Sequence, residues 1–209
     1  VAPNSNTATL SIASTVTVTP INDAPTLSAT ASNPTFTEGS GSGVQGSAVS
    51  VFSGASVSTV EAGQTIAGLT FTVSGVVDGT NEKIIVDGTT LTLSSGSTGT
   101  TQTNGLSYSV TFNGTNKVST VVLSGGSLTA SAAQTLVNGI QYQNTSLDDP
   151  TSGSRVVTLT QLVDSGSNVA PNSNTATLSI ASTVTVTPIN DAPTLSATAS
   201  NPTFTEGSG

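Results

Sequence analysis

The sequence predicts an all-β fold: a β-sandwich, repeated in tandem, with at most one short helix. Apolar residues alternate with Thr and Ser along most of the chain, which is the pattern of strands that bury one face. Turn sequences separate these short stretches, and aromatic residues are few. Residues 1–41 recur letter for letter as residues 169–209, which predicts one full period of a tandem array and the start of the next.

The longest predicted strand occurs in both copies of the repeated segment. From Ala8 to Val18 the even positions are apolar apart from Ser14, with mostly Thr and Ser between them. This alternation predicts a long half-buried strand that ends at Pro20, because proline cannot continue a hydrogen-bonded ladder. The same strand is predicted at residues 176–186.

Shorter alternating stretches predict the other strands of the sandwich. They lie near residues 69–73, 91–93, 106–112 and 157–159. Two dipeptides between such stretches, Asp87-Gly88 and Asn113-Gly114, predict tight hairpin turns that require positive φ.

One segment of the sequence predicts a helix. Residues 130–137, ASAAQTLV, are rich in Ala, and Thr129 or Ser131 can cap their N-terminal end. Asn138-Gly139 can end the helix. We expect this short helix to pack at the edge of the sandwich.

The sequence PINDAP marks the boundaries between repeats. It occurs at residues 20–25 and 188–193, and its two prolines must end the preceding strand. The predicted parts are a terminal strand of the preceding repeat (1–21), a linker (22–25), a complete sandwich (26–187), a second linker (188–193) and the first strand of the following repeat (194–209).

The composition argues against most enzymes and against several kinds of partner. The chain has no His and no Cys, so it lacks the commonest general base, thiolate nucleophiles and the usual zinc ligands, and we expect no enzymatic activity. Eleven acidic residues against three basic ones argue against nucleic acid as a partner. No apolar run reaches membrane-spanning length, so no membrane insertion is expected. Acidic side chains favour a hard cation such as calcium.

The linker and its surroundings resemble a known family. A long terminal strand followed by PINDAP is similar to the ends of cadherin-like and related repeats in giant bacterial surface adhesins exported by type I secretion. Residues 155–167, RVVTLTQLVDSGS, resemble the penultimate strand of those repeats, and Glu38-Gly39 resembles their early Glu-Gly step. The resemblance implies an immunoglobulin/cadherin-like sandwich, a location outside the cell at its surface, and calcium ions that stiffen the rod between domains.

Under this resemblance, calcium ligands are expected at both ends of the sandwich. At the top, Asp164 follows the penultimate strand and should lie near Asn22 and Asp23 of the incoming linker. Each junction would then receive ligands from two neighbouring repeats. The alternative is that the linker Asp makes an Asx-turn before proline and that Asp164 begins a glycine-containing turn.

At the bottom, the outgoing linker contributes its own candidate ligands. Asn190 and Asp191 are expected there, and Glu38, Asp148 and Asp149 are candidates to join them. The two adjacent acids precede a proline, so they are equally compatible with a turn.

Most other charged residues are expected to be structural. Arg155 is expected to pair with Asp148 or Asp149, and Lys83 to be an edge lysine that discourages strand pairing. The acids expected to be solvated turn residues are Glu61, Asp78, Glu82 and Asp87.

Three functions follow from these observations. The first is a calcium-stiffened spacer of a very long extracellular bacterial adhesin or matrix protein, whose partners are identical neighbouring repeats and, through other regions, cells or surfaces. The second is a self-assembling extracellular filament, in which a strand of one copy completes the sandwich of another. The third, a carbohydrate-binding module, is weak because Tyr108 and Tyr142 are the only tyrosines and Trp is absent.

Overall fold

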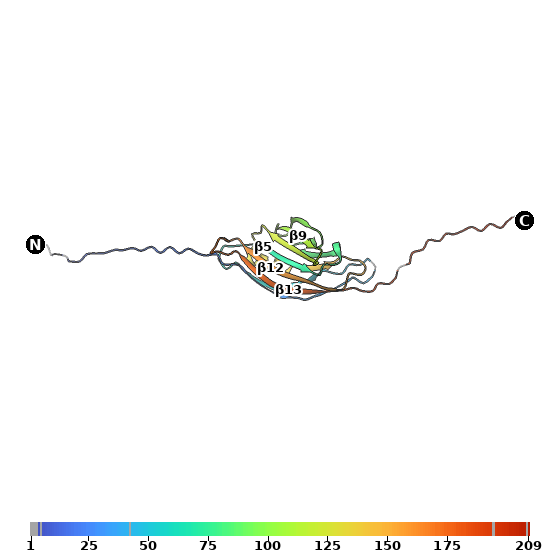
Figure 1. Ribbon diagram of the computed structural model, residues 1–209, viewed down its shortest axis with the longest axis horizontal. Helices are drawn as coiled ribbons and strands as arrows, with labels where there is room; N and C mark the ends of the chain where they lie inside the picture. Colours follow the sequence, from blue (N-terminus) through green and yellow to red (C-terminus); the bar gives the residue numbers. More distant parts are fainter. Residues whose placement is uncertain (1–3, 5, 42, 194, 208) are drawn as a thin grey trace.

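The computed structural model describes residues 4, 6–41, 43–193, 195–207 and 209. It confirms the predicted all-β sandwich, with strands in three sheets and one short α-helix. The strands form a central body, from which two extended segments leave at opposite ends (Figure 1). Among the described residues, no helix is long and apolar enough to cross a membrane.

One layer of the sandwich is a seven-stranded sheet in the order β2-β13-β12-β5-β10-β9-β8. Neighbouring strands are antiparallel, except that β2 runs parallel to β13. The strands are β2 Thr35–Thr37, β5 Ile66–Ser74, β8 Ser97–Thr100, β9 Ser107–Asn113, β10 Val118–Ser124, β12 Gly153–Asp164 and β13 Thr175–Thr187.

Two smaller sheets contribute to the same core. One has the order β3-β11-β6-β7, and the other pairs β1 with β4. One hydrophobic cluster contains residues of all three sheets, and the rings of Phe36 and Tyr142 meet edge to face with centroids 5.7 Å apart. The strands are β1 Thr26–Ala31, β3 Val49–Ser50, β4 Phe52–Ser58, β6 Glu82–Val86, β7 Thr89–Thr92 and β11 Gln141–Asn144; a short 3₁₀ turn, η1 Gly79–Asn81, precedes β6.

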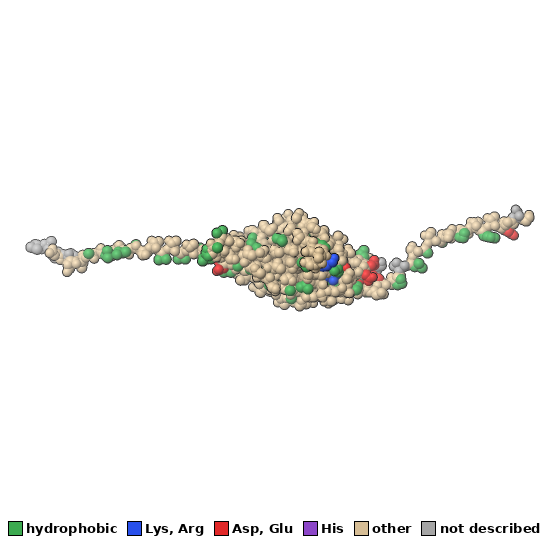
Figure 2. Space-filling model, viewed as in Figure 1, with side chains coloured by type: hydrophobic (Ala, Val, Ile, Leu, Met, Phe, Trp, Pro, Cys, Tyr) green, Lys and Arg blue, Asp and Glu red, His purple; other side chains and the backbone are tan. Residues whose placement is uncertain are grey.

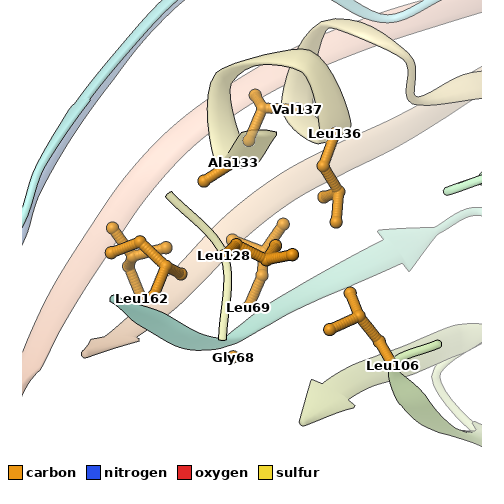
Figure 3. Close-up of a pocket in the computed structure, with 9 residues that line it drawn as sticks. Gly68, Leu69, Leu106, Leu128, Ala133, Leu136, Val137 and Leu162 are labelled. Carbon is orange, nitrogen blue, oxygen red and sulfur yellow. The ribbon is translucent and has the colours of Figure 1, made fainter. Parts of the chain in front are cut away.

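The predicted helix is confirmed as α1, Ala130–Asn138. The Thr129 side chain accepts a hydrogen bond from the Ala132 N–H (3.1 Å), and Gly139 follows the last turn. The helix directs Leu136 and Val137 toward leucines of β5 and β12 (Figure 3). The cavity left between them is about 10 Å³, roughly the space of one water, so this apolar site is packed core.

The two predicted hairpin turns differ. Asp87 and Gly88 join β6 to β7 with φ of 50° and 75°, as a tight two-residue turn requires. The second prediction is wrong in length: β9 pairs Asn113 with Val118, so four residues intervene and the positive φ falls on Lys117. The Asn113 side chain explains the longer loop, because its Oδ1 accepts from the Thr115 N–H at 3.0 Å.

The two copies of the long predicted strand adopt different states. Residues 176–186 lie within β13, and Val184 is fully buried. The identical residues 8–18 are extended but form no strand, and Val16, the counterpart of Val184, is 82% exposed. A strand with one apolar face needs a sheet beside it, and none of the sheets formed by the described residues includes this segment.

The C-terminal segment shows the same contrast. Residues 195–207 form no strand, and Leu195 and Phe204 are exposed. Their counterparts Leu27 and Phe36 are buried in β1 and β2. We call residues 8–19 the N-terminal arm and residues 195–207 the C-terminal arm. Residues 1–3, 5, 194 and 208 of the predicted flanking strands lie outside the described residues.

The repeated sequence provides a matched test of this packing. Val184→Ala removes buried methyl groups and is expected to lower the free energy of unfolding by about 2 kcal/mol. Val16→Ala makes the same change in the exposed arm and is expected to leave it unchanged. Denaturant unfolding followed by circular dichroism measures both. Equal effects of the two substitutions would contradict the assignment of the arm as unpacked.

Candidate functional site

Asn22 fixes the incoming linker to the top end of the sandwich. Its N–H donates to Asn172 Oδ1 at 2.7 Å, and its carbonyl accepts from the Ser173 N–H at 2.9 Å. Its side-chain amide donates to the carbonyls of Ser173 (2.7 Å) and Ser167 (3.2 Å). All three partners belong to the loop between β12 and β13, so this loop holds the linker in place.

Asp164 ends β12 beside Asn22, where the sequence predicted it. Its Oδ1 accepts from the Gly166 N–H at 2.7 Å and from the Asn22 side-chain amide at 3.4 Å. Its Oδ2 is buried and has no hydrogen-bond partner among the described residues, in a side chain that is almost wholly inaccessible to water. A buried carboxylate oxygen is costly unless a donor or a cation compensates it, and such an oxygen is a suitable calcium ligand.

Two residues of the loop between β4 and β5 join this end, and neither was predicted there from the sequence. Glu61 Oε1 accepts from the Asp23 N–H at 3.0 Å, so Glu61 lies in a turn as expected but is half-buried and bound to the linker instead of being freely solvated. The Gln64 amide donates to Asn22 Oδ1. Glu61 Oε2 and Gln64 Oε1 are both buried, and neither has a hydrogen-bond partner in the part of the chain that the structure describes. With Asn22 they line a surface depression of about 340 Å³.

Glu38 holds the outgoing linker at the bottom end. It follows β2, its N–H donates to the Thr187 carbonyl at 3.1 Å, and its Oε2 accepts from the Ile189 N–H at 2.9 Å. Its Oε1 is buried, and no described residue forms a hydrogen bond with it. Asp191 Oδ1 accepts from the Gly41 N–H at 3.0 Å. Acidic side chains gather on this end of the body, where the C-terminal arm leaves (Figure 2).

The other predicted ligands are less closely held. Asp148 and Asp149 are exposed, and among the described residues no hydrogen bond or ion pair joins either of them to Glu38 or Asp191. The Ser146 hydroxyl donates to the Asp148 carbonyl at 2.7 Å, and Asp149 has a φ of 54°, so these acids form a turn. Asn190 is exposed, and its amide donates to the carbonyl of its neighbour Asp191 at 3.3 Å.

The repeat relates the two ends to each other. Residues 190–191 are the same Asn-Asp pair as residues 22–23, one period later. In the first copy the pair contacts Asp164 and Glu61 of the sandwich that follows it. In the second copy Asp191 accepts from the Gly41 N–H, and Ile189, just before the pair, donates to Glu38 of the sandwich that precedes it. A linker between two complete repeats would therefore meet both sets of side chains.

The buried oxygens without a partner are distributed over the same two ends of the sandwich. In the part of the chain that the structure describes, four buried side-chain polar atoms lack a partner, and they belong to Glu38, Glu61, Gln64 and Asp164. No group of three or more Asp or Glu side chains among the described residues could hold a metal ion by itself. The two sets of oxygens together match the carboxylate and amide ligands that calcium prefers.

A second charged cluster lies inside the sandwich, and it overturns the expected partners of Arg155. The Arg155 guanidinium pairs with Glu82 through Nε and with Asp78 Oδ2 at 3.1 Å, and not with Asp148 or Asp149. The Tyr142 hydroxyl donates to Glu82 Oε1 at 3.1 Å. Burial raises the pKa of the Glu82 carboxyl, and the hydrogen bond from Arg155 opposes that rise.

The expectations for four further charged residues are also wrong. Glu82 and Asp87 are buried, and Asp87 accepts from the Asn104 N–H at 3.0 Å; Asp78 is tied to Arg155 and to the Asn144 amide at 2.7 Å. Lys83 is on β6, which lies between β11 and β7, so it is not at a sheet edge. Its ammonium donates to Thr92 Oγ1 at 2.7 Å.

Comparisons of the chain with protein-family models, with curated proteins and with solved structures found no match. Function is therefore inferred from the residues at the two ends of the sandwich and from the repeat.

The internal ion pair predicts a large effect on stability. Arg155→Met is expected to lower the free energy of unfolding by about 3–5 kcal/mol, because it leaves Glu82 buried without its cation. Lys117→Met also replaces a positive charge by Met, but at an exposed position, and is expected to have little effect. Urea unfolding of both variants checks this, and a small effect at Arg155 would contradict the ionic role of the cluster.

Proposed function

We propose that this chain is a structural repeat of a very long extracellular bacterial adhesin or matrix protein. It acts as a spacer, and calcium stiffens the junctions between repeats. One observation carries the proposal: the buried unpartnered oxygens lie at the two ends of the sandwich. Because the linkers are identical, each junction would place the bottom end of one repeat beside the top end of the next. Calcium is the hard, oxygen-liganded type of cation that these side chains suit.

The arrangement of the chain supports a spacer. The two arms leave the body at opposite ends (Figure 1), so each added repeat extends an array along one direction. The linkers are short, and hydrogen bonds hold both of them to the sandwich, through Asn22 at the top and through Glu38 at the bottom. Repeats that contact only their neighbours add length without needing any other partner.

Charge at the junction makes stiffness depend on the cation. Glu38 of one repeat and Asp164 and Glu61 of the next would gather on one linker, and like charges at close range repel. Calcium supplies the positive charge that neutralises them and binds oxygens from both repeats at once. Without it, repulsion favours orientations that keep the two ends apart, so the junction is expected to bend.

The location outside the cell rests on the resemblance of the linker and of residues 155–167 to repeats of bacterial surface adhesins. Extracellular fluids also hold calcium at concentrations that weak extracellular sites require, on the order of 10⁻⁴–10⁻³ M. A site assembled from two separate repeats suits that range, because binding must order the junction.

The first test measures the shape of a chain of four identical repeats. Small-angle X-ray scattering in millimolar calcium is expected to show a long rod, and in chelator a particle with a shorter maximum dimension and the profile of a flexible chain. Magnesium at the same concentration controls for general charge screening. A shape that calcium does not change would contradict the proposal.

A matched pair of substitutions tests the ligands. Asp164→Asn in every repeat keeps the Oδ1 that accepts from Gly166 but removes a buried carboxylate charge, and the calcium response is expected to be lost. Asp149→Asn removes the same charge from an exposed turn and is expected to keep the response. Circular dichroism establishes that both variants fold. Equal losses in the two variants would contradict a specific site at the top end.

A further inference from the structure

The N-terminal arm has the pattern of a strand but belongs to none of the sheets that the described residues form. Its apolar side chains Leu10, Ile12, Val16 and Val18 are each about four-fifths exposed. They alternate with polar residues, as in the identical segment that forms β13. The arm therefore carries an apolar face that another sheet can bury.

The structure shows the place in a sheet that fits this sequence. β13 lies between β12 and β2, with Thr185 opposite Ser154 of β12 and opposite Thr35 of β2. Thr17 is the counterpart of Thr185 in the arm. Because residues 8–19 and 176–187 are identical, the arm can make the same backbone and side-chain contacts in this position as those residues of β13, in the same register.

The arm cannot take this position in its own molecule. β13 begins beside the top end, where Ser173 contacts Asn22, and ends at the bottom, where the Thr187 carbonyl accepts from Glu38. The strand has 13 residues, which span about 40 Å at roughly 3.3 Å per residue. Thr19 would have to lie at the bottom while Asn22, three residues later, stays at the top, and three residues reach only about 11 Å.

We propose that residues 8–19 are a donor strand for a second copy of this chain. The arm of one copy replaces β13 in the sheet of another, with Thr17 of the donor opposite Ser154 of the acceptor. The donor linker then leaves the acceptor beside Glu38, where the acceptor's own linker leaves in the closed molecule. Copies thus join head to tail with the same junction that covalent repeats have. Such exchange is distinct from the spacer function, because it requires no calcium.

Competition with β13 decides when the exchange occurs. The two strands are identical, so an inserted arm restores the interactions that a displaced β13 gives up. The acceptor's own strand is attached to its sheet through a short loop, which gives it an effective concentration on the order of millimolar. The closed molecule is therefore favoured in dilute solution, and exchange increases when β13 is weakened or displaced.

The exact repeat allows the donor and the resident strand to be weakened separately. Val184→Asp with Val186→Asp places two charges in the core and weakens β13, while the arm stays intact. We expect this full-length variant to form soluble oligomers whose masses are integer multiples of the chain, measured by size-exclusion chromatography with light scattering. Val16→Asp with Val18→Asp makes the same changes in the arm alone, and this matched control is expected to stay monomeric with an unchanged unfolding midpoint.

The variant with all four substitutions identifies the donor. It is expected to lose the oligomers, because neither copy of the strand can then complete a sandwich. If the β13 variant is monomeric and unfolded, the arm does not act as a donor and the proposal is wrong. Oligomers that persist in the fourfold variant would overturn it as well, because their formation would not depend on the arm.

A disulfide cross-link tests the register of the inserted strand. The chain has no cysteine, and Thr17 and Ser154 are both exposed, so Thr17→Cys with Ser154→Cys can be introduced into the β13 variant without disturbing the core. Oxidation is expected to give a ladder of covalent multimers on a non-reducing gel. Thr9→Cys with Ser154→Cys is the control, because Thr177, the counterpart of Thr9, lies opposite Gln161. Equal ladders from the two pairs would contradict the proposed register.

Discussion

The pairing of β13 with β12 and β2 is the interaction on which the rest of the structure depends. β13 lies between β2, at one edge of the large sheet, and β12. Val184 and Val186 of β13 are buried in the core. The loop that leads into β13 holds Asn22, and the end of β13 holds Glu38. One strand therefore positions the candidate ligands at both ends, so the geometry of each junction follows from the register of this strand.

The same dependence connects length, stiffness and assembly. The linker sequence occurs twice, and each occurrence lies at a different half of the candidate site. Among the described residues, each half retains buried oxygens that have no hydrogen-bond partner. Under the two proposals, a neighbouring repeat would supply what each repeat lacks: oxygens for a cation at the junction, and a sheet for the strand that precedes it. Because the two copies are identical in sequence, the proposed exchange would let this strand of any copy fit the sandwich of any other.

Local pattern was enough to predict much of this fold. Alternation gave the all-β class and β13, capping residues gave α1, and Asp87-Gly88 gave a tight turn. The position of Asp164 beside Asn22 was expected from the resemblance of residues 155–167 to a family repeat, and not from local pattern. Long-range pairing could not be read in this way: Arg155 meets Glu82 across 73 residues of sequence, and no periodicity encodes that contact. The N-terminal arm shows that local pattern can also predict a strand that does not form: residues 8–18 have strand propensity but lack the sheet that would make them a strand. Glu61 and Gln64 were missed because a short loop gives no sign of what lies opposite it.

The proposed calcium site would form only where two repeats meet, and this would distinguish the proposed spacer from a string of independent sandwiches. Equilibrium dialysis with radioactive calcium can detect it, on chains that contain two, three and four complete sandwiches. The number of bound ions is expected to rise in proportion to the number of junctions between complete sandwiches, with one sandwich alone binding far more weakly. Ions bound in proportion to the number of sandwiches, or no binding at millimolar calcium, would show that the junctions do not form the site.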